Sequence, residues 1–228
     1  MIEMKDVYKR YPNGVTAVSG IDIHIKQGEF VYVVGPSGAG KSTFIKMMYR
    51  EEKPSSGTIT IDGVNLAALK NTKVPLMRRK IGVVFQDFKL LPTLTVYENV
   101  AFALEVIEEH PKNIKKQVME TLELVGLKHK ARMLPTELSG GEQQRVSIAR
   151  SIVNSPKVVI ADEPTGNLDP DTSWEIMNIF DEINTRGTTV VMATHNKEIV
   201  NTIKHRVIAI EGGRIVRDEQ RGDYGYES

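Results

Sequence analysis

The sequence predicts an α/β protein whose core is a parallel sheet, and two observations support this. Short apolar segments rich in β-branched residues alternate along the chain with segments of helical periodicity. Some apolar segments are nonpolar at every position, as strands are when helices cover both faces of a sheet. A helical block at residues 88–155 interrupts the alternation, so we expect a helical subdomain inserted into a core of residues 1–87 and 156–228. All 228 residues then belong to one domain.

The expected strands lie in the first and last parts of the chain. Apolar and polar residues alternate over Ile21–Ile25, which predicts a half-buried strand. Apolar or β-branched runs predict further strands at Phe30–Val34, Thr58–Ile61, Ile81–Phe85, Val158–Ala161 and Thr189–Met192. Near the C-terminus, the run Glu211, Gly212 and Gly213 is typical of a hairpin turn. We expect it to join strands at Arg206–Ile210 and Arg214–Val216.

Three helices are expected between these strands. Their apolar faces consist of Ile114, Val118, Leu122 and Val125 in the first, Val146, Ala149, Ile152 and Val153 in the second, and Ile176, Ile179, Phe180 and Ile183 in the third. Gly126 follows the first helix as a typical C-terminal stop. Asp169 and Pro170 suit the N-cap and first turn of the third helix. We expect the polar tail from Arg217 to Ser228 to fray.

The composition argues against several classes of protein. A net charge of +1 gives no electrostatic reason to expect nucleic acid as a partner. The absence of cysteine excludes disulfides and thiolate metal sites. No apolar stretch reaches the roughly 18 residues that span a bilayer, and residues 1–6 carry charges where a signal peptide needs an apolar run. We therefore expect a cytoplasmic chain that reaches a membrane only through a partner.

A glycine-rich motif lies between the expected strand Phe30–Val34 and a further expected helix at Thr43–Met48, and it predicts a phosphate-binding loop. It consists of Gly35, Pro36, Ser37, Gly38, Ala39, Gly40, Lys41 and Ser42, which match G-x-x-x-x-G-K-[ST]. The glycines let backbone N–H groups and the helix N-terminus approach an anion closely. We expect Lys41 to reach the β- and γ-phosphates and Ser42 to hold Mg²⁺. The alternative is a plain strand-to-helix turn, but a chance match is on the order of one in a hundred at this glycine usage.

Two acidic residues follow the expected strand Val158–Ala161. Ligands of open α/β sheets bind at the carboxyl ends of the strands, where Asp162 and Glu163 stand. Asp162 suits a water-mediated contact to magnesium, and Glu163 suits orienting or deprotonating an attacking water. A lone acid at a strand end is usually a solvated loop residue. The phosphate loop in the same chain favours the functional interpretation.

A second glycine motif, Leu138-Ser139-Gly140-Gly141, precedes the helix that carries Val146. Ser139 and Glu142 have the spacing of a capping box, so an ordinary helix start is one interpretation. A cap does not need two glycines in the first turn, where each costs about 1 kcal/mol of helix propensity relative to alanine. Two glycines at a helix N-terminus leave N–H groups open to an anion, which favours a second phosphate contact.

The phosphate loop, the Ser139 motif and the acidic pair at a strand end together resemble the nucleotide-binding subunits of ABC transporters. The resemblance covers nearly the whole chain. It implies a P-loop NTPase of the ABC type, with a mixed core sheet, an antiparallel β subdomain and an inserted helical subdomain. It also implies ATP and Mg²⁺ as ligands, and a head-to-tail homodimer. Each ATP would lie between one subunit's phosphate loop and the other's Ser139, Gly140 and Gly141.

Further positions match the family pattern one at a time. Gln86 matches a glutamine that senses magnesium and links to the membrane subunit, although a buried strand-end amide is the alternative. His195 matches a histidine that contacts the γ-phosphate. Asp169 matches a loop that crosses the dimer interface, and it also suits an N-cap. Tyr11 matches an aromatic residue that stacks on adenine, with Tyr8 as the nearby alternative.

The resemblance also implies the catalytic roles. MgATP is expected on Lys41, Ser42 and Thr43 of one subunit. Glu163 is expected to position the attacking water, while Lys41, His195 and magnesium stabilise the developing charge. One position departs from the pattern, because Glu142 stands where many relatives have glutamine. We expect activity to survive this change, since the serine and glycines of the motif remain.

Within the family, the chain resembles ATPases of bacterial cell division. The stretches that carry this likeness are Leu69–Asn71, Val74–Pro75, Arg78–Arg79, Phe85–Asp87, Leu90–Leu91 and Thr95–Tyr97. The stretch Ala161–Asp169 is shared with lipoprotein-release and macrolide-export ATPases, which leaves such transporters as the alternative. The resemblance implies an integral membrane partner at the inner face of the plasma membrane. We expect that partner to contact Gln86, Phe88, Leu90 and Leu91, although the last three could instead pack inside the helical subdomain.

Other classes of nucleotide-binding protein fit less well. ABC ATPases that act on nucleic acid carry a long coiled coil between their glycine motifs, or two ATPase domains. A module that binds without hydrolysis would lack the catalytic acid Glu163. A GTPase is disfavoured because Asn196 and Lys197 begin an Asn-Lys-x-Asp motif that ends at Ile199 rather than at aspartate.

Overall fold

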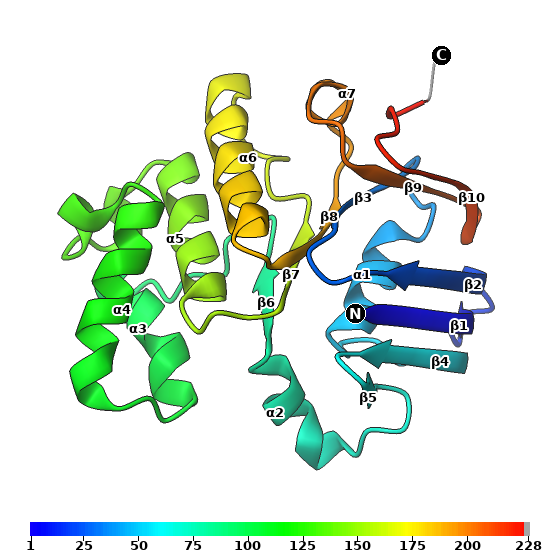
Figure 1. Cartoon of the computed structure of the whole chain (residues 1–228), viewed down its shortest axis with the longest axis horizontal. Helices are drawn as coiled ribbons and strands as arrows, with labels where there is room; N and C mark the ends of the chain where they lie inside the picture. The colour runs from blue at the N-terminus through cyan, green and yellow to red at the C-terminus, as the bar shows by residue number, and fades with distance from the viewer. Residues whose placement is uncertain (226–228) are drawn as a thin grey trace.

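In the computed structural model, which describes residues 1–225, helices pack around two sheets (Figure 1). The first sheet is antiparallel, with the strand order β2-β1-β4-β5. Its strands are β1 (Ile2–Arg10), β2 (Thr16–Ile25), β4 (Ser56–Ile61) and β5 (Val64–Asn65). This is the antiparallel unit expected from the sequence.

The second sheet is mixed and has the order β10-β9-β3-β8-β7-β6. Its strands are β3 (Phe30–Val34), β6 (Ile81–Val84), β7 (Val158–Asp162), β8 (Thr189–Ala193), β9 (Arg206–Glu211) and β10 (Arg214–Glu219). Neighbouring strands from β9 to β6 are parallel, and only β10 is antiparallel to its neighbour. The carboxyl ends of β3, β6, β7 and β8 therefore meet at one edge of the sheet, as ligand sites of α/β folds require.

Seven α-helices lie within the described residues. They are α1 (Lys41–Met48), α2 (Val74–Arg78), α3 (Val96–Val106), α4 (Pro111–Leu124), α5 (Gly140–Ile152), α6 (Pro170–Thr185) and α7 (Lys197–Thr202). Short 3₁₀ turns occur at Asn71–Lys73, Lys128–Lys130 and Pro135–Glu137. Local sequence explains the helix starts: Asp169 caps α6 by accepting from the Thr172 N–H at 3.0 Å, as expected. Figure 1 shows α3, α4 and α5 gathered at one end of the molecule and the antiparallel sheet at the other.

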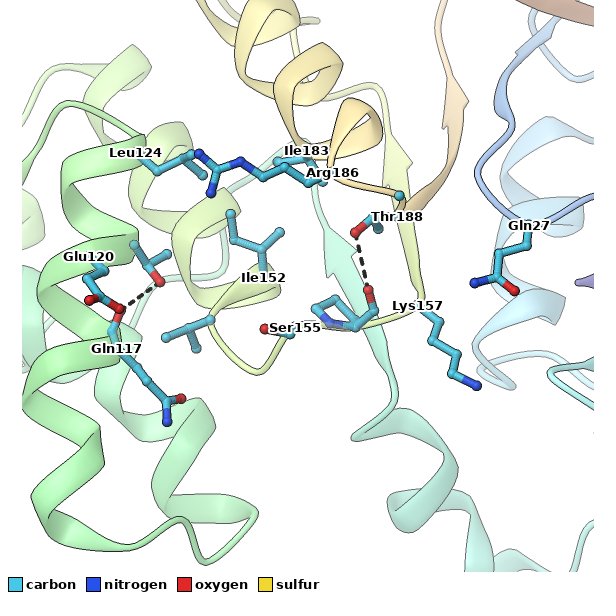
Figure 2. Close-up of a pocket in the computed structure, with 14 residues that line it drawn as sticks. Gln27, Gln117, Glu120, Leu124, Ile152, Ser155, Lys157, Ile183, Arg186 and Thr188 are labelled. Carbon is cyan, nitrogen blue, oxygen red and sulfur yellow. Dashed lines mark hydrogen bonds between the residues drawn. The ribbon is translucent and has the colours of Figure 1, made fainter.

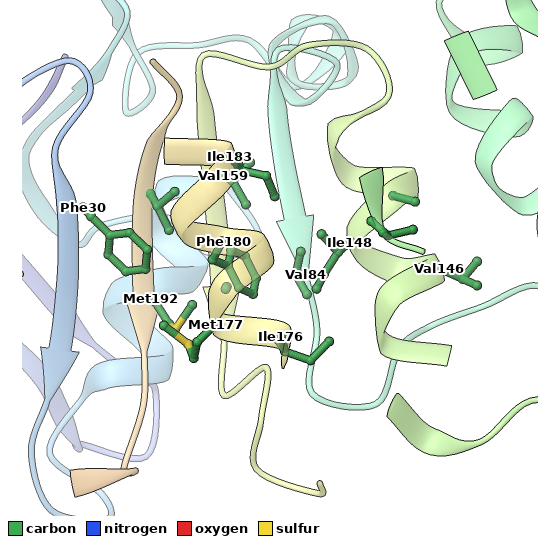
Figure 3. Packing of buried hydrophobic residues seen from close by; sticks show 14 of the residues in the cluster. Phe30, Val84, Val146, Ile148, Val159, Ile176, Met177, Phe180, Ile183 and Met192 are labelled. Atoms are coloured by element: carbon green, nitrogen blue, oxygen red, sulfur yellow. The ribbon is translucent and has the colours of Figure 1, made fainter. Parts of the chain in front are cut away.

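The central strand β3 separates two hydrophobic clusters. Tyr32 and Val34 face a cluster that includes buried residues of α3, α4, α5 and α6. Val31 and Val33 face the other cluster, which includes α1 and the antiparallel sheet. Figure 3 shows Phe180 and its neighbours on α6 directed at the strands of the core sheet. The phosphate-loop helix α1 and the Ser139 helix α5 therefore lie on opposite faces of this sheet.

The C-terminal tail corrects one expectation, because its described part is docked rather than frayed. Strand β10 continues to Glu219, beyond the expected end at Val216. The Arg217 guanidinium then donates to the carbonyls of Asp223 at 2.6 Å and Tyr224 at 2.7 Å. The Tyr224 side chain is buried. The last part of the expected frayed tail, residues 226–228, lies outside the described residues.

Across residues 1–225, none of the helices combines the length and the apolar character needed to cross a lipid bilayer.

Candidate nucleotide site

The phosphate loop leaves β3 and enters α1, and its glycines are required by the backbone. Gly35 and Gly40 have φ angles of 147° and 104°. A Cβ at Gly35 would lie 2.1 Å from the Ile210 carbonyl oxygen, and one at Gly40 would lie 2.2 Å from that of Ala17. No side chain fits at such distances. The loop is thus held tightly between β2 and β9, which fixes where its N–H groups point.

Lys41 lies over the loop that precedes it. Its ammonium donates to the carbonyl of Gly35 at 2.8 Å and to that of Pro36 at 3.1 Å. The side chain therefore places a positive charge next to the backbone N–H groups of the loop. This arrangement suits the β- and γ-phosphates of a nucleotide.

Asp162, at the end of β7, has the environment expected of a cation site. Its Oδ1 atom is buried without a hydrogen-bond partner. Burial raises the pKa of this carboxyl group and the neighbouring Glu163 charge raises it further, while Lys46, Lys41 and a hydrogen bond from Ser42 oppose the shift. A buried carboxylate oxygen beside a serine hydroxyl is a donor set that Mg²⁺ accepts. The residues present therefore fit the expected magnesium, with Ser42 and Asp162 on the side of the loop.

Glu163 and His195 form a joined pair beyond the ends of β7 and β8. One carboxylate oxygen, Oε2, lies 2.8 Å from His195 Nδ1 and accepts the His195 backbone N–H at 3.1 Å. Glu163 adopts the left-handed conformation, with φ of 49°, which is unusual for a residue other than glycine. Its side chain is only 16% exposed, whereas that of His195 is 62% exposed. The strained turn thus aims a largely covered carboxylate at an exposed imidazole.

Gln86 follows β6 and faces the segment that precedes α6. It is exposed, and its Nε2 donates to Asn167 Oδ1 at 3.2 Å. A Cβ at Gly166 would lie 3.1 Å from the same amide nitrogen, so glycine allows the close approach. Gln86 is therefore joined to the loop that ends at Asp169, and the alternative of a buried strand-end amide is wrong.

The Ser139 motif begins α5 with a complete capping box. Ser139 Oγ accepts the Glu142 N–H at 3.3 Å, and Glu142 Oε2 accepts the Ser139 N–H at 3.0 Å. Glu142 also pairs with Lys130 at 2.5 Å, and this hydrogen bond is the main cause that lowers the pKa of its carboxyl group. The capping interpretation thus holds, and the unusual glutamate has a structural partner. Ser139 and Gly140 are nevertheless exposed, which leaves them open to a phosphate, whereas Gly141 is buried against Thr172.

Comparison with known proteins decides the family. The sequence model of the ABC transporter family matches residues 18–166. This chain belongs to the ABC transporter family. Among curated ABC proteins, it is 75% identical to the cell division ATP-binding protein FtsE of Bacillus subtilis over 225 residues, which is 99% of each chain. It is 52% identical to FtsE of Mycobacterium tuberculosis, over 100% of this chain and 99% of that one.

Solved ABC structures have the same fold. A dimeric post-hydrolysis state of the ATP-binding cassette MJ0796, bound to ADP and Pi, superposes with a TM-score of 0.87. It is 36% identical and covers 97% of this chain and 99% of its own. The cassette cbiO1 from Clostridium perfringens gives a TM-score of 0.89 at 33% identity, over 96% of this chain and 88% of its own. The ABC fold class and the likeness to cell-division ABC proteins, both expected from the sequence, are confirmed.

The aromatic position of the ABC pattern is occupied by a tyrosine close to the phosphate loop. The Tyr11 hydroxyl lies 3.3 Å from Thr43 Oγ1 at the start of α1. Tyr8, the alternative, has its hydroxyl against Gly20, 3.0 Å from where a Cβ would be. The geometry therefore favours Tyr11 as the residue that flanks an adenine.

A cavity of about 460 Å³ lies away from these ABC residues (Figure 2). It is lined by Lys157 and Thr188, which immediately precede β7 and β8, and by Gln117 and Glu120 on α4. The expected nucleotide residues follow the opposite, carboxyl ends of the same strands. This cavity is therefore not the ABC nucleotide site.

Sequence reasoning missed one residue that contacts the site and one that docks the C-terminal tail. Asn167 contacts Gln86, and its signal was its place between Gly166 and the expected N-cap. Tyr224 lies in a tail expected to fray, and its signal was an aromatic residue flanked by Gly222 and Gly225 in an otherwise polar segment.

Proposed function

We propose that this ABC ATPase is the ATP-hydrolysing subunit of a membrane complex that acts in bacterial cell division. The main support is the acidic pair beside the phosphate loop, where Asp162 has an unpaired buried oxygen and Glu163 is joined to His195. Identity of 75% to an FtsE protein over nearly the whole chain supports the cell-division role.

The proposed ligand is MgATP, bound by the loop from Gly35 to Ser42. Backbone N–H groups and Lys41 hold the β- and γ-phosphates, and Ser42 and Thr43 contact the nucleotide from the start of helix α1. Tyr11 stacks on the adenine ring. Magnesium, held by Ser42 and approached by Asp162 and Gln86, would supply charge to stabilise the γ-phosphate.

Hydrolysis is proposed to use the pair formed by Glu163 and His195. Glu163 accepts a proton from a water whose oxygen attacks the γ-phosphorus. The bond from that phosphorus to the β–γ bridging oxygen breaks, which leaves ADP and phosphate. Lys41 and His195 stabilise the charge that develops on the transferred group. The hydrogen bond from the His195 backbone N–H fixes Glu163 in advance of this step.

A second copy of the chain is proposed to complete each site. The phosphate loop and the Ser139 motif lie on opposite faces of the core sheet in one chain. ATP held by one loop is therefore contacted by Ser139, Gly140 and Gly141 of the other chain in a head-to-tail dimer. Asp169 lies in the loop that crosses this interface. The dimeric MJ0796 cassette has the same fold and supports this assembly.

The proposed membrane partner is FtsX-like, and it holds the ATPase at the inner face of the plasma membrane. Its contact surface would be Gln86 with Phe88, Leu90 and Leu91, at the start of a helical subdomain of residues 88–155. Phe88 and the other two side chains are partly buried. Arg150 anchors this segment by donating to the Phe88 carbonyl at 3.0 Å. Nucleotide-driven closure would then be transmitted across the membrane to control cell-wall hydrolases.

Replacing Glu163 with glutamine tests the proposal. Glu163→Gln should lower steady-state ATP hydrolysis by about a hundredfold or more, because the amide cannot accept the water's proton. Affinity for a fluorescent ATP analogue should stay within about threefold, since the phosphate loop is unchanged. Glu120→Gln, on the exposed side of α4, is the matched control. An unchanged hydrolysis rate in Glu163→Gln would remove the role assigned to this residue.

A further inference from the structure

Helix α5, which begins at the Ser139 motif, carries a buried amide that reaches the residues after strand β7. Gln144 is fully buried, and its Nε2 atom donates to the Pro164 carbonyl at 2.7 Å. Pro164 directly follows Glu163, so this hydrogen bond reaches the residue next to the proposed catalytic carboxylate. The helix of the Ser139 motif is therefore tied to the turn that carries Glu163 in the same chain.

Glutamine is an unfavourable side chain for packing alone at this position. The second polar atom of Gln144, Oε1, is buried and has no hydrogen-bond partner within residues 1–225. A buried polar atom without a partner destabilises a protein, and methionine would fill a similar volume without this cost. A donor to the Pro164 carbonyl explains the glutamine, whereas packing does not.

The turn that begins at Glu163 is strained and depends on neighbouring contacts. Glu163 has φ of 49°, which residues other than glycine rarely adopt unless their surroundings fix it. Its N–H donates to the Ala193 carbonyl at 3.0 Å, and its carbonyl accepts the Gly166 N–H at 3.1 Å, which closes the turn. Pro164 has no N–H to contribute. The hydrogen bond from Gln144 therefore holds the central peptide group of this turn.

We propose that Gln144 is a positioning residue for ATP hydrolysis, which holds the turn after β7 so that the Glu163 carboxylate stays in line with the attacking water. This role rests on the function proposed for Glu163. The same carboxylate is joined to His195 through the backbone N–H at 3.1 Å and Nδ1 at 2.8 Å. Gln144 thus restrains the backbone beside Glu163, while His195 restrains its side chain.

Loss of this hydrogen bond should affect turnover more than nucleotide binding. ATP in the ground state is held by the phosphate loop and Lys41, which lead into α1 on the opposite face of the sheet from α5. The transition state also needs Glu163 within hydrogen-bond distance of the water, and small misplacements of such a group are costly. We therefore expect kcat to fall while KM and nucleotide affinity change little.

Three variants of the full chain separate this role from packing. Gln144→Met removes the donor with little change of volume and should lower kcat by about tenfold, with KM within about twofold of the original. Gln144→Asn keeps the amide but is one methylene shorter, so it should also lower kcat. Ser147→Ala is the matched control. Ser147 lies three positions later on α5 and its hydroxyl is likewise buried and unpaired within the described residues, so this variant should hydrolyse ATP normally.

A double variant shows whether Gln144 acts through Glu163. In a Glu163→Gln background, adding Gln144→Met should change hydrolysis by less than about twofold, because no carboxylate is left to position. A further tenfold fall would mean an independent structural role and would overturn the inference. Glu163→Gln alone tests the proposed function. If it hydrolyses ATP normally, that function has failed, whereas its loss beside an unchanged kcat in Gln144→Met removes only the role of Gln144.

Hydrogen exchange gives a readout that does not depend on turnover. The Gly166 N–H closes the turn and the His195 N–H holds the Glu163 carboxylate. Both amides should exchange faster in Gln144→Met than in the original chain, as followed by NMR without nucleotide, and should be unchanged in Ser147→Ala. Equal exchange in Gln144→Met and the original chain would contradict the positioning role even where kcat has fallen.

Discussion

The two glycine motifs of this chain use glycine for different physical reasons. In the phosphate loop, Gly35 and Gly40 have positive φ, and a Cβ at either would collide with backbone of the same chain. In the Ser139 motif, Gly140 is helical, and its nearest neighbours would be at ordinary contact distance, 3.6 Å and 3.9 Å. The first motif needs glycine to fold. Gly140 is needed only if something outside the protomer approaches it.

The acidic side chains beside the two motifs also differ, because one is unpaired within the chain and the other is paired. Asp162, next to the phosphate loop, keeps an unpaired buried oxygen and has a raised pKa. Glu142, next to Ser139, is paired with Lys130 and has a lowered pKa. The first carboxyl group is destabilised in the protomer and awaits a ligand, whereas the second is already satisfied. The phosphate loop therefore has a polar group beside it that is left unsatisfied in the single chain. The Ser139 motif, by contrast, is a helix start whose polar groups are already satisfied within one chain.

Gly40→Ala should have the largest effect. The added methyl would meet the Ala17 carbonyl at 2.2 Å, and alanine is strained at this φ. We expect loss of about 1–3 kcal/mol of unfolding free energy and at least about a tenfold loss of nucleotide affinity. Urea unfolding and binding of a fluorescent ATP analogue measure the two effects. Gly63→Ala is the control, because Gly63 has φ of +77° but open space around its Cβ position. Gly63→Ala should lose stability but keep its nucleotide affinity. Equal losses of affinity in both variants would contradict the special role of Gly40.

Gly140→Ala should separate stability from activity. Alanine at the start of α5 should raise the unfolding free energy by up to about 1 kcal/mol, since the helix gains propensity and no clash arises. ATP hydrolysis should nevertheless fall by about tenfold or more, because the methyl occupies the surface proposed to contact the γ-phosphate of the ATP bound to a second chain. Gly141→Ala sharpens the contrast, since its Cβ would lie 2.3 Å from Thr172 Cγ2 and should cost stability. Normal hydrolysis by Gly140→Ala would show that this surface meets no nucleotide.

Asp162→Asn should stabilise the protein without nucleotide and weaken MgATP binding. The pKa of Asp162 is raised above its ordinary 3.8, so the folded chain holds this proton more tightly than the unfolded chain. The stability of the folded chain therefore falls as the pH rises from 3.8 through the raised pKa of Asp162. Asparagine does not ionise, so the variant does not lose this stability. At pH 7 the variant should gain about 1 kcal/mol, or roughly 2–4 °C in Tm, and the gain should shrink near pH 4. A gain that grows at low pH would contradict the assignment.

Glu142→Gln should have the smallest effect. Glutamine retains the capping hydrogen bonds but loses the ion pair with Lys130, so we expect a loss of about 0.5 kcal/mol. The pKa of Glu142 is lowered below 4.5, so its contribution is present above that pH and disappears as the pH falls. Thermal unfolding at pH 7 and pH 4 measures the difference. Hydrolysis should stay within about twofold, and a large loss would show that the charge serves the reaction.

Local signals predicted much of the fold and of the site. The phosphate loop and the acids at the end of β7 could be predicted because strand, turn and ligand chemistry lie next to one another in the sequence. The capping box of Ser139 and the N-cap Asp169 were found because caps depend on residues three positions apart. These features need no knowledge of distant contacts.

Features that depend on distant contacts were not predictable. Strand β1 was not identified, because its buried residues Ile2, Met4 and Val7 break alternation where Asp6 adopts a φ of 49° and the register shifts. The contact of Gln86 with Asn167 joins residues 81 positions apart. Docking of Tyr224 depends on Arg217 and on α7, and neither is visible from the polarity of the tail.

The central claim is that one ATP site is built from two copies of this chain. The most direct test is the solution mass of Glu163→Gln, measured by light scattering with saturating MgATP. The account predicts a dimer that forms only with nucleotide, and a return to single chains when Ser139→Arg is added to the same protein. Single chains in the Glu163→Gln variant, or a dimer that Ser139→Arg does not disturb, would contradict it.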